Sequence, residues 1–194
     1  MKNVVNLKDG TEVCIRPMEE GDLEASVAFF RDLPLEDRSY LRVDVSRPEV
    51  VQARIDAMKG GRVHRLVGLA GDRIVADGAL ELGEHGWKQH VGEVRLIVAR
   101  DFQRKGLGSL MTRELFLHAA KEKLEEVVVR FMRPQVGAQT IFRRLGFRSE
   151  VLLPDYVVDQ EGHKQDLVVM RCPLQDLWEE LEWYLAHEDW QRTR

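Results

Sequence analysis

The segment from residue 94 to residue 109 constrains the fold of this chain more than any other. It reads Val-Arg-Leu-Ile-Val-Ala-Arg-Asp-Phe-Gln-Arg-Lys-Gly-Leu-Gly-Ser, which predicts a buried strand, a short basic turn and the start of a helix. The first backbone N–H groups of a helix have no partner inside it, and the helix dipole adds partial positive charge there. A phosphate or pyrophosphate group is therefore the expected ligand of this turn.

Two familiar phosphate-binding loops do not fit the turn. A dinucleotide-binding fingerprint needs a third glycine or alanine at position 111, which is Met111. A Walker loop needs Lys and then Ser or Thr after its glycine, whereas Gly108 is followed by Ser109 and Leu110. The remaining pattern, Gln-x-x-Gly-x-Gly from Gln103, is weak by itself. An ordinary strand-to-helix turn with solvated basic residues explains it equally well.

A second informative block lies downstream of the turn. Ala138, Ile141, Phe142 and Leu145 recur at helical spacing, which predicts a helix over residues 135–145. Glycine is the residue that most often ends a helix, and the sequence continues Gly-Phe directly after this one.

The two blocks, in this order, resemble the GNAT family, the Gcn5-related N-acetyltransferases. In that family the glycine turn reads Gln/Arg-x-x-Gly-x-Gly/Ala, and the later helix ends in a Leu-Gly-Phe-like step. The resemblance is strong over residues 94–147 and looser over about 7–172. Residues 7–17 together with 38–42 resemble, more narrowly, the acetyltransferase domain of bacterial protein lysine acetyltransferases that regulate acyl-CoA synthetases.

Composition limits the other classes of function. With 194 residues, 44% hydrophobic and 32% charged, the chain has the size and polarity of one soluble domain with at most an appendage. No apolar run approaches the roughly 20 residues that span a bilayer. The net charge of −4 argues against general nucleic-acid binding. Arg143 and Arg144 are a local basic exception that a rim around a phosphate-bearing cofactor explains.

Redox and targeting features point to the cytoplasm. Residues 1–6 lack the apolar core of a signal peptide. Cys14 and Cys172 give no disulfide framework and are expected to be packed thiols. The histidines show no pair at metal-ligand spacing on a helix, so no metal site is expected.

The chain is expected to form an α+β fold of the GNAT type. Its sheet is mixed, mostly antiparallel and twisted, with about seven strands flanked by helices. The expected strands are residues 11–17, 64–70, 74–82, 92–98, 126–132, 147–153 and 165–171, and the expected helices are 19–33, 48–59, 106–123 and 135–145. Residues 1–172 form the acetyltransferase domain. Residues 173–194 form an extension, with an amphipathic helix over 174–190 that packs on the domain or forms a contact in a homodimer.

The resemblance implies acetyl-CoA as acyl donor and a primary amine as acceptor, either a protein lysine or a small-molecule amine. It also implies that the strands 92–98 and 126–132 separate, so that the pantetheine arm lies between them and the pyrophosphate lies at the turn. A backbone N–H near Leu96 or Ile97 then stabilises the oxyanion of the thioester carbonyl. The residues expected to bind the cofactor are Leu96, Ile97, Val98, Gln103, Arg104, Lys105, Gly106, Leu107, Gly108, Ser109, Gln135 and Phe142.

Glu93 is the expected catalytic base. An amine has to lose a proton before it attacks, and lysine acetyltransferases resembled here carry a catalytic glutamate at the matching position. Strand alternation places Glu93, Arg95 and Ile97 on one face. The alternative is a carboxylate at a strand end that faces water or pairs with Arg95. Glu81 on the neighbouring strand is a second carboxylate, expected to be structural.

The chain departs from the family at the position of the general acid. Many members carry a tyrosine in the last helix of the core, and the matching residue here is Phe142, which cannot donate a proton. Gln135 stands where many members carry asparagine. Thiol release without an acid is feasible, with water or Gln135 as donor. The alternative is a non-catalytic module that senses acyl-CoA or binds a partner.

Overall fold

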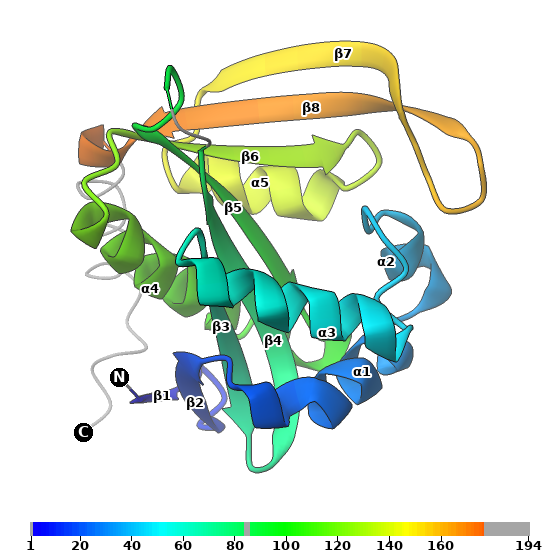
Figure 1. Ribbon diagram of the computed structural model, residues 1–194, viewed down its shortest axis with the longest axis vertical. Helices are drawn as coiled ribbons and strands as arrows, with labels where there is room; N and C mark the ends of the chain where they lie inside the picture. The colour runs from blue at the N-terminus through cyan, green and yellow to red at the C-terminus, as the bar shows by residue number, and fades with distance from the viewer. Residues whose placement is uncertain (1, 84–85, 177–194) are drawn as a thin grey trace.

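One eight-stranded sheet organises the molecule, with strand order β1-β2-β3-β4-β5-β6-β8-β7 (Figure 1). The computed structural model describes residues 2–83 and 86–176. The strands are β1 (Asn3–Asn6), β2 (Glu12–Pro17), β3 (Val63–Ala70), β4 (Arg73–Leu82), β5 (Val91–Val98), β6 (Glu126–Met132), β7 (Ser149–Val158) and β8 (Lys164–Pro173). The α-helices are α1 (Leu23–Asp32), α2 (Leu35–Ser39), α3 (Pro48–Asp56), α4 (Leu107–Lys121) and α5 (Val136–Arg144), and 3-10 helices span Glu20–Asp22, Ala57–Gly60 and Arg100–Phe102.

The expected α+β architecture is confirmed. Among the described strands only β5 and β6 run parallel, and all other neighbours pair antiparallel. The alternation of strands and helices after an initial antiparallel half produces this mixed sheet.

The sheet has one strand more than expected, because β1 was missed. β1 pairs Val4 with Cys14 and Val5 with Val13. Val4 is 57% exposed, so β1 has only a weak apolar pattern. Its place is decided by backbone hydrogen bonds to β2, a signal that hydrophobic periodicity does not carry.

The helix expected at 19–33 begins differently from the prediction. It starts with the 3-10 turn Glu20–Asp22 and continues as α1, and Asp22 makes no side-chain cap of α1. Both Asp22 oxygens instead accept hydrogen bonds from the Arg16 guanidinium at 2.7 Å, and Oδ2 also accepts the Glu19 N–H at 2.8 Å. Asp22 therefore stands at the N-cap position of α1 without capping it, because the Arg16 side chain on β2 binds its carboxylate.

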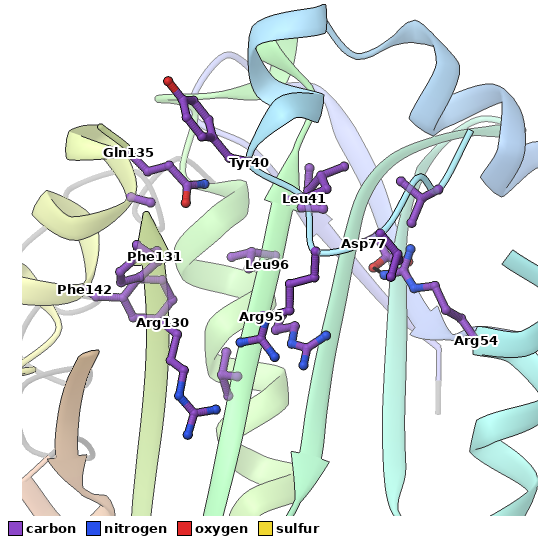
Figure 2. Close-up of a pocket in the computed structure, with 16 residues that line it drawn as sticks. Tyr40, Leu41, Arg54, Asp77, Arg95, Leu96, Arg130, Phe131, Gln135 and Phe142 are labelled. Atoms are coloured by element: carbon purple, nitrogen blue, oxygen red, sulfur yellow. Dashed lines mark hydrogen bonds and ion pairs between the residues drawn. The ribbon is translucent and has the colours of Figure 1, made fainter. Parts of the chain in front are cut away.

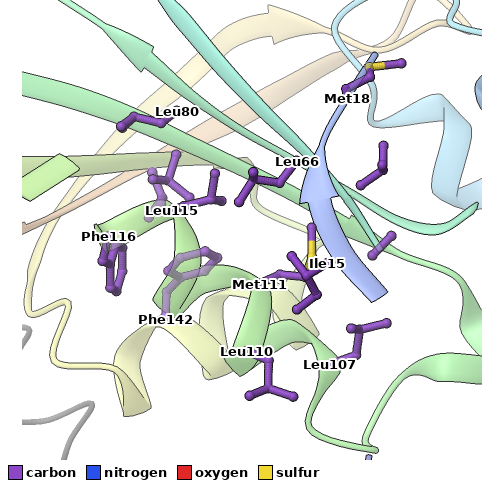
Figure 3. Packing of buried hydrophobic residues seen from close by; sticks show 14 of the residues in the cluster. Ile15, Met18, Leu66, Leu80, Leu107, Leu110, Met111, Leu115, Phe116 and Phe142 are labelled. Carbon is purple, nitrogen blue, oxygen red and sulfur yellow. The ribbon is translucent and has the colours of Figure 1, made fainter. Parts of the chain in front are cut away.

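The core lies on both faces of the sheet. Leu107, Met111 and Leu115 recur at helical spacing on α4 and are fully buried against it (Figure 3). Gly78 on β4 allows this close approach, because an added Cβ would lie 3.1 Å from Leu115 Cδ1. The neighbouring Asp77 contacts Arg54 of α3 on the opposite face, which α1 and α3 cover (Figure 1).

The predictions for the two cysteines and for the C-terminal helix have different outcomes. Cys172 is buried as expected, whereas Cys14 is only half-buried. The helix expected over 174–190 lies almost entirely outside the described residues, so its packing or dimer role stays a prediction. In the part of the chain that the structure describes, no helix is long and apolar enough to cross a membrane.

Candidate active site

The two central strands separate directly after Glu93. The parallel pairs between β5 and β6 are Val91–Glu126, Gly92–Val127 and Glu93–Val128, and within the described residues none follows. On its other side β5 stays paired with β4 as far as Val98. The edge of β5 that faces β6 is therefore open over residues 94–98, as the sequence predicted.

The turn after β5 leads into α4, and no side chain caps the N-terminus of this helix within the described residues. Gly106 precedes α4 with a φ of 92°, a left-handed conformation that favours glycine, and Arg104 adopts a φ of 61°. The Gln103 side chain donates a hydrogen bond to the Val98 carbonyl at 3.0 Å and so ties the turn to the end of β5. Among residues 2–83 and 86–176, no side chain caps α4. Its first N–H groups therefore remain available to an anion.

The protein's own packing does not require a glycine at position 108. A Cβ added to Gly108 would meet only Leu96 Cδ2 at 3.9 Å and Val98 Cγ2 at 4.0 Å, both ordinary contacts. The space beside this residue is thus left for something other than protein atoms. A pyrophosphate at the helix N-terminus fits such a space.

The turn is less positively charged than its sequence predicts, because acidic side chains pair with two of its basic residues. Arg100, Arg104 and Lys105 are the basic residues of this segment, but Lys105 Nζ lies 2.8 Å from Asp9 Oδ2. That hydrogen bond lowers the pKa of Asp9 to about 2. Arg100 pairs with Glu36 and Asp37 of α2. Two of the three basic side chains are therefore already compensated.

The open edge of β5 borders a cavity (Figure 2). Its walls come from the segment after α2, from α3, from β4, β5 and β6, and from α5 with the preceding Gln135. Four of the residues expected to bind the cofactor line it: Leu96, Ile97, Gln135 and Phe142. Lining residues that the sequence reasoning missed as site residues include Tyr40, Arg42, Arg54, Asp77 and Arg130.

Glu93 lies where the strands separate, and arginines surround it. Arg42 Nη2 donates to Oε1 and Arg130 Nη1 donates to Oε2, while Arg95 Nε lies 3.6 Å from Oε1. The Glu93 side chain is only 13% exposed. The alternative interpretation, a carboxylate paired with Arg95, thus holds in part, but Arg42 and Arg130 are the closer partners.

A second group of ion pairs continues from this carboxylate along the sheet. Arg95 Nη2 lies 2.6 Å from Glu81 Oε2. Asp77 Oδ1 receives Arg65 Nη1 at 2.6 Å and Arg54 Nη2 at 3.1 Å. Burial lowers the pKa of the Arg54 guanidinium and that of Arg95. Glu81 therefore forms an ion pair with Arg95, which is the structural role expected for it.

The side of the cavity formed by Gln135 and α5 has few groups that can donate a proton. The Phe142 ring lies 5.3 Å from Phe131 and 5.1 Å from Phe147, measured between centroids, and Phe142 is 4% exposed. Gln135 Oε1 accepts the Met132 N–H at 2.9 Å. Tyr40 is the lining residue with a hydroxyl, and Figure 2 shows it beside Gln135.

Leu107 is also a core residue, which limits what it can do for a ligand. Its side chain is fully buried, so only its backbone can contact a ligand. Ser109 is buried at the same end of α4. The turn therefore presents mainly its backbone to a ligand.

The sheet opens beside an uncapped helix N-terminus, with a carboxylate at the point of opening, which is the arrangement that the resemblance to the GNAT family implied. Residues 62–149 match the family model described as "Acetyltransferase (GNAT) domain". Over these residues the chain is therefore similar to the domain of acetyltransferases. This match agrees with the expected enzyme class and with acetyl-CoA as the acyl donor.

Solved structures agree on the fold. RimJ of Mycobacterium smegmatis in complex with CoA-disulfide matches with a TM-score of 0.77 and 16% identity, over 95% of this chain and 93% of that one. The putative acetyltransferase yncA of Salmonella typhimurium, solved with acetyl-CoA, matches at 0.72 and 17%, over 89% and 94%. The GNAT domain of S. lividans PAT matches at 0.69 and 17%, over 89% and 96%. A search of curated proteins finds no match.

Proposed function

We propose that this protein acetylates a primary amine by direct attack of the amine on acetyl-CoA, with Glu93 as the general base. One observation carries the proposal. The opening between β5 and β6 begins at Glu93, and β5 leads from there to the uncapped N-terminus of α4. A ligand that binds its phosphates at that helix and extends along the open edge of β5 brings its far end toward Glu93.

The backbone provides most of the contacts to the donor. The N–H groups of residues 104–109 hold the pyrophosphate. The open edge of β5 over residues 94–98 offers hydrogen bonds to the amides of the pantetheine arm. A backbone N–H near Leu96 or Ile97 stabilises negative charge on the thioester oxygen during attack. The lining residues Gln135 and Phe142 support the arm from α5.

Proton transfer involves Glu93 and solvent. An unperturbed lysine-type amine has a pKa near 10.4, so it arrives protonated at neutral pH and gives one proton to Glu93. The nitrogen lone pair then forms a bond to the carbonyl carbon, and the C–S bond breaks. The second proton passes from the nitrogen to solvent, and the thiolate takes a proton from solvent. An ordinary thiol has a pKa near 8.5, so departure without an acid at Phe142 is feasible.

The ion pairs of Glu93 add a requirement. Both of its oxygens accept hydrogen bonds, from Arg42 and Arg130. Each carboxylate oxygen can accept a second hydrogen bond, so the ammonium group of the acceptor has to reach Glu93 past the two guanidinium groups.

The same contacts favour one second candidate, a protein that binds acyl-CoA without turnover. A base that stays fully ion-paired and a phenylalanine in place of the usual tyrosine are both consistent with binding alone. Under the main proposal the acceptor is the side chain of a protein lysine or a small-molecule amine.

The variant Glu93→Gln separates the two candidates. We expect kcat to fall by about 100-fold or more, as on loss of a general base, while the Kd for acetyl-CoA changes less than about twofold. Calorimetry measures the Kd, and detection of released CoA thiol measures turnover. Glu126→Gln is the matched control, since Glu126 is also a strand carboxylate held by an arginine, Arg171, at 2.8 Å.

Two results would count against the proposal. If the native protein binds acetyl-CoA but releases no thiol with any amine in a broad panel, the binding module is the better description. If Glu93→Gln keeps full turnover, another group is the base.

A further inference from the structure

The cavity beside Glu93 carries more arginine than a site for a generic amine needs. Four arginines line it, and each comes from a different part of the fold: Arg42 after α2, Arg54 on α3, Arg95 on β5 and Arg130 on β6. Figure 2 shows Arg54 next to Asp77, with Arg95 on β5 and Arg130 on β6. Asp77 is the one carboxylate among the lining residues.

The carboxylates nearby do not balance these arginines. The group of ion pairs at this cavity comprises Arg42, Arg54, Arg65, Arg95, Arg130, Asp77, Glu81 and Glu93. Glu93 is shared by Arg42 and Arg130. Asp77 is likewise shared by Arg54 and Arg65. Within this group of described residues, guanidinium groups therefore outnumber carboxylates.

Partial burial adds a cost to this excess of positive charge. Desolvation is the main cause that lowers the pKa of Arg54 and of Arg95, and the neighbouring arginines lower both further. The Nε of Arg95 has no hydrogen-bond partner among the described residues, although its Nη2 pairs with Glu81. The side chains of Arg42, Arg95 and Arg130 are 42%, 36% and 35% exposed, so a ligand can reach them. An anion bound here compensates the positive charge that the carboxylates leave over.

We propose that the acceptor is a small primary amine that carries its own acidic group, a carboxylate or a phosphate, bound by Arg42, Arg95 and Arg130. This inference rests on the proposed function. Guanidinium groups match the planar or tetrahedral oxygens of both acids and bind them with charge-assisted hydrogen bonds. Polyamines, whose further amino groups are cationic, are disfavoured in the same cavity.

The proposal also explains how Glu93 becomes available. The acid of the acceptor competes with Glu93 for Arg42 and Arg130. When it takes over one of them, an oxygen of Glu93 loses that hydrogen bond close to the ammonium group of the same molecule. Binding of the correct acceptor thereby clears the approach to the base, and a neutral amine lacks the group to do so.

Matched acceptor pairs test the inference. The pairs are β-alanine with β-alaninamide and O-phosphoethanolamine with ethanolamine, and spermidine represents polycations. With acetyl-CoA as donor we expect kcat/KM for at least one acidic member to exceed that of its neutral partner by about tenfold or more. Arg42→Gln should reduce this ratio by about tenfold through a higher KM for the acidic member. Arg47→Gln is the matched control, because Arg47 pairs with Glu49 outside the cavity.

The outcomes separate this inference from the proposed function. If calorimetry shows no binding of acetyl-CoA, the proposed function itself fails. If acetyl-CoA binds and the neutral members react as well as the acidic ones, or a protein lysine or spermidine is preferred, only the inference is overturned. A preference for succinyl-CoA with neutral amines would assign the arginines to the donor and also overturn it.

If no amine of the panel is acetylated, calorimetric binding of the same amines tests the inference instead. Saturable calorimetric heat from the acidic members with acetyl-CoA-loaded protein, and none from their neutral partners, supports the inference. Equal heats, or none from any member, contradict it.

Discussion

Glu81 and Glu93 lie directly opposite each other on β4 and β5, and the guanidinium of Arg95 bridges them. Its Nη2 lies 2.6 Å from Glu81 Oε2, and its Nε lies 3.6 Å from Glu93 Oε1. Like charges in directly opposed strand positions repel each other, so the bridge is needed where the sheet begins to open. The candidate base therefore has a third arginine near it, which Glu81 on the neighbouring strand holds in place.

This relationship gives a first prediction, on stability. Replacing Arg95 with Met leaves Glu81 without this partner, and we expect a coupling energy of about 0.5–2 kcal/mol between positions 81 and 95. A double-mutant cycle with Glu81→Gln, Arg95→Met and the double variant, followed by urea unfolding at pH 7, measures this energy. Strictly additive effects would mean that the bridge makes no net contribution to folding.

A second prediction concerns Gly108. Because a Cβ there meets only ordinary contacts, Gly108→Ala should fold with an unchanged or higher Tm. The same Cβ occupies the space assigned to the pyrophosphate, so we expect the Kd for acetyl-CoA to rise by about tenfold or more. Calorimetry and thermal unfolding measure the two effects.

The matched control is Gly21→Ala, where an added Cβ meets nothing within 4 Å and lies in the 3-10 helix before α1. It should leave the Kd unchanged. Normal affinity in the Gly108→Ala protein would show that the coenzyme does not approach this residue.

A third prediction follows from Asp22, which is 7% exposed. Its hydrogen bonds with Arg16 lower the pKa of the Asp22 carboxyl below the usual range of an aspartate. A carboxyl whose pKa is lower in the folded state stabilises the protein above the unfolded pKa, and this stability is lost as the pH falls through the folded pKa. We expect Asp22→Asn to cost about 1.5–3 kcal/mol at pH 7 and less below about pH 3.

Urea unfolding of both proteins across this pH range measures the difference. The exposed Asp32, at the end of α1, provides the control Asp32→Asn, which should lose little stability at any pH. A cost of Asp22→Asn that stays constant down to pH 2 would show that ionisation of Asp22 is not its source.

Local patterns identified most of the sheet. The bounds of β6 were predicted correctly, because its β-branched and aromatic residues are buried and only Arg130 interrupts them. The turn before α4 was also found, because Gly106 and Gly108 follow the basic residues at the spacing of a phosphate-binding turn. These features are encoded within a few neighbouring residues.

The arginines around Glu93 could not be found in the same way. Arg42 and Arg130 are separated from Glu93 by 51 and 37 residues, and only the folded sheet and the segment after α2 bring them together. Arg130 did carry a signal, since it is a charged residue inside an otherwise apolar strand. Arg42 lies outside any regular element, and its sequence neighbours indicate no such contact.

An amide NMR titration of isotope-labelled protein with acetyl-CoA tests the proposed coenzyme site directly. A coenzyme along the open edge of β5 and at the start of α4 shifts the amides nearest to it. We therefore expect saturable shifts concentrated at the amides of residues 94–98 and 104–109, with Glu93 at the boundary of the affected region. Saturable shifts confined to other elements, or no shift at millimolar acetyl-CoA, would contradict it.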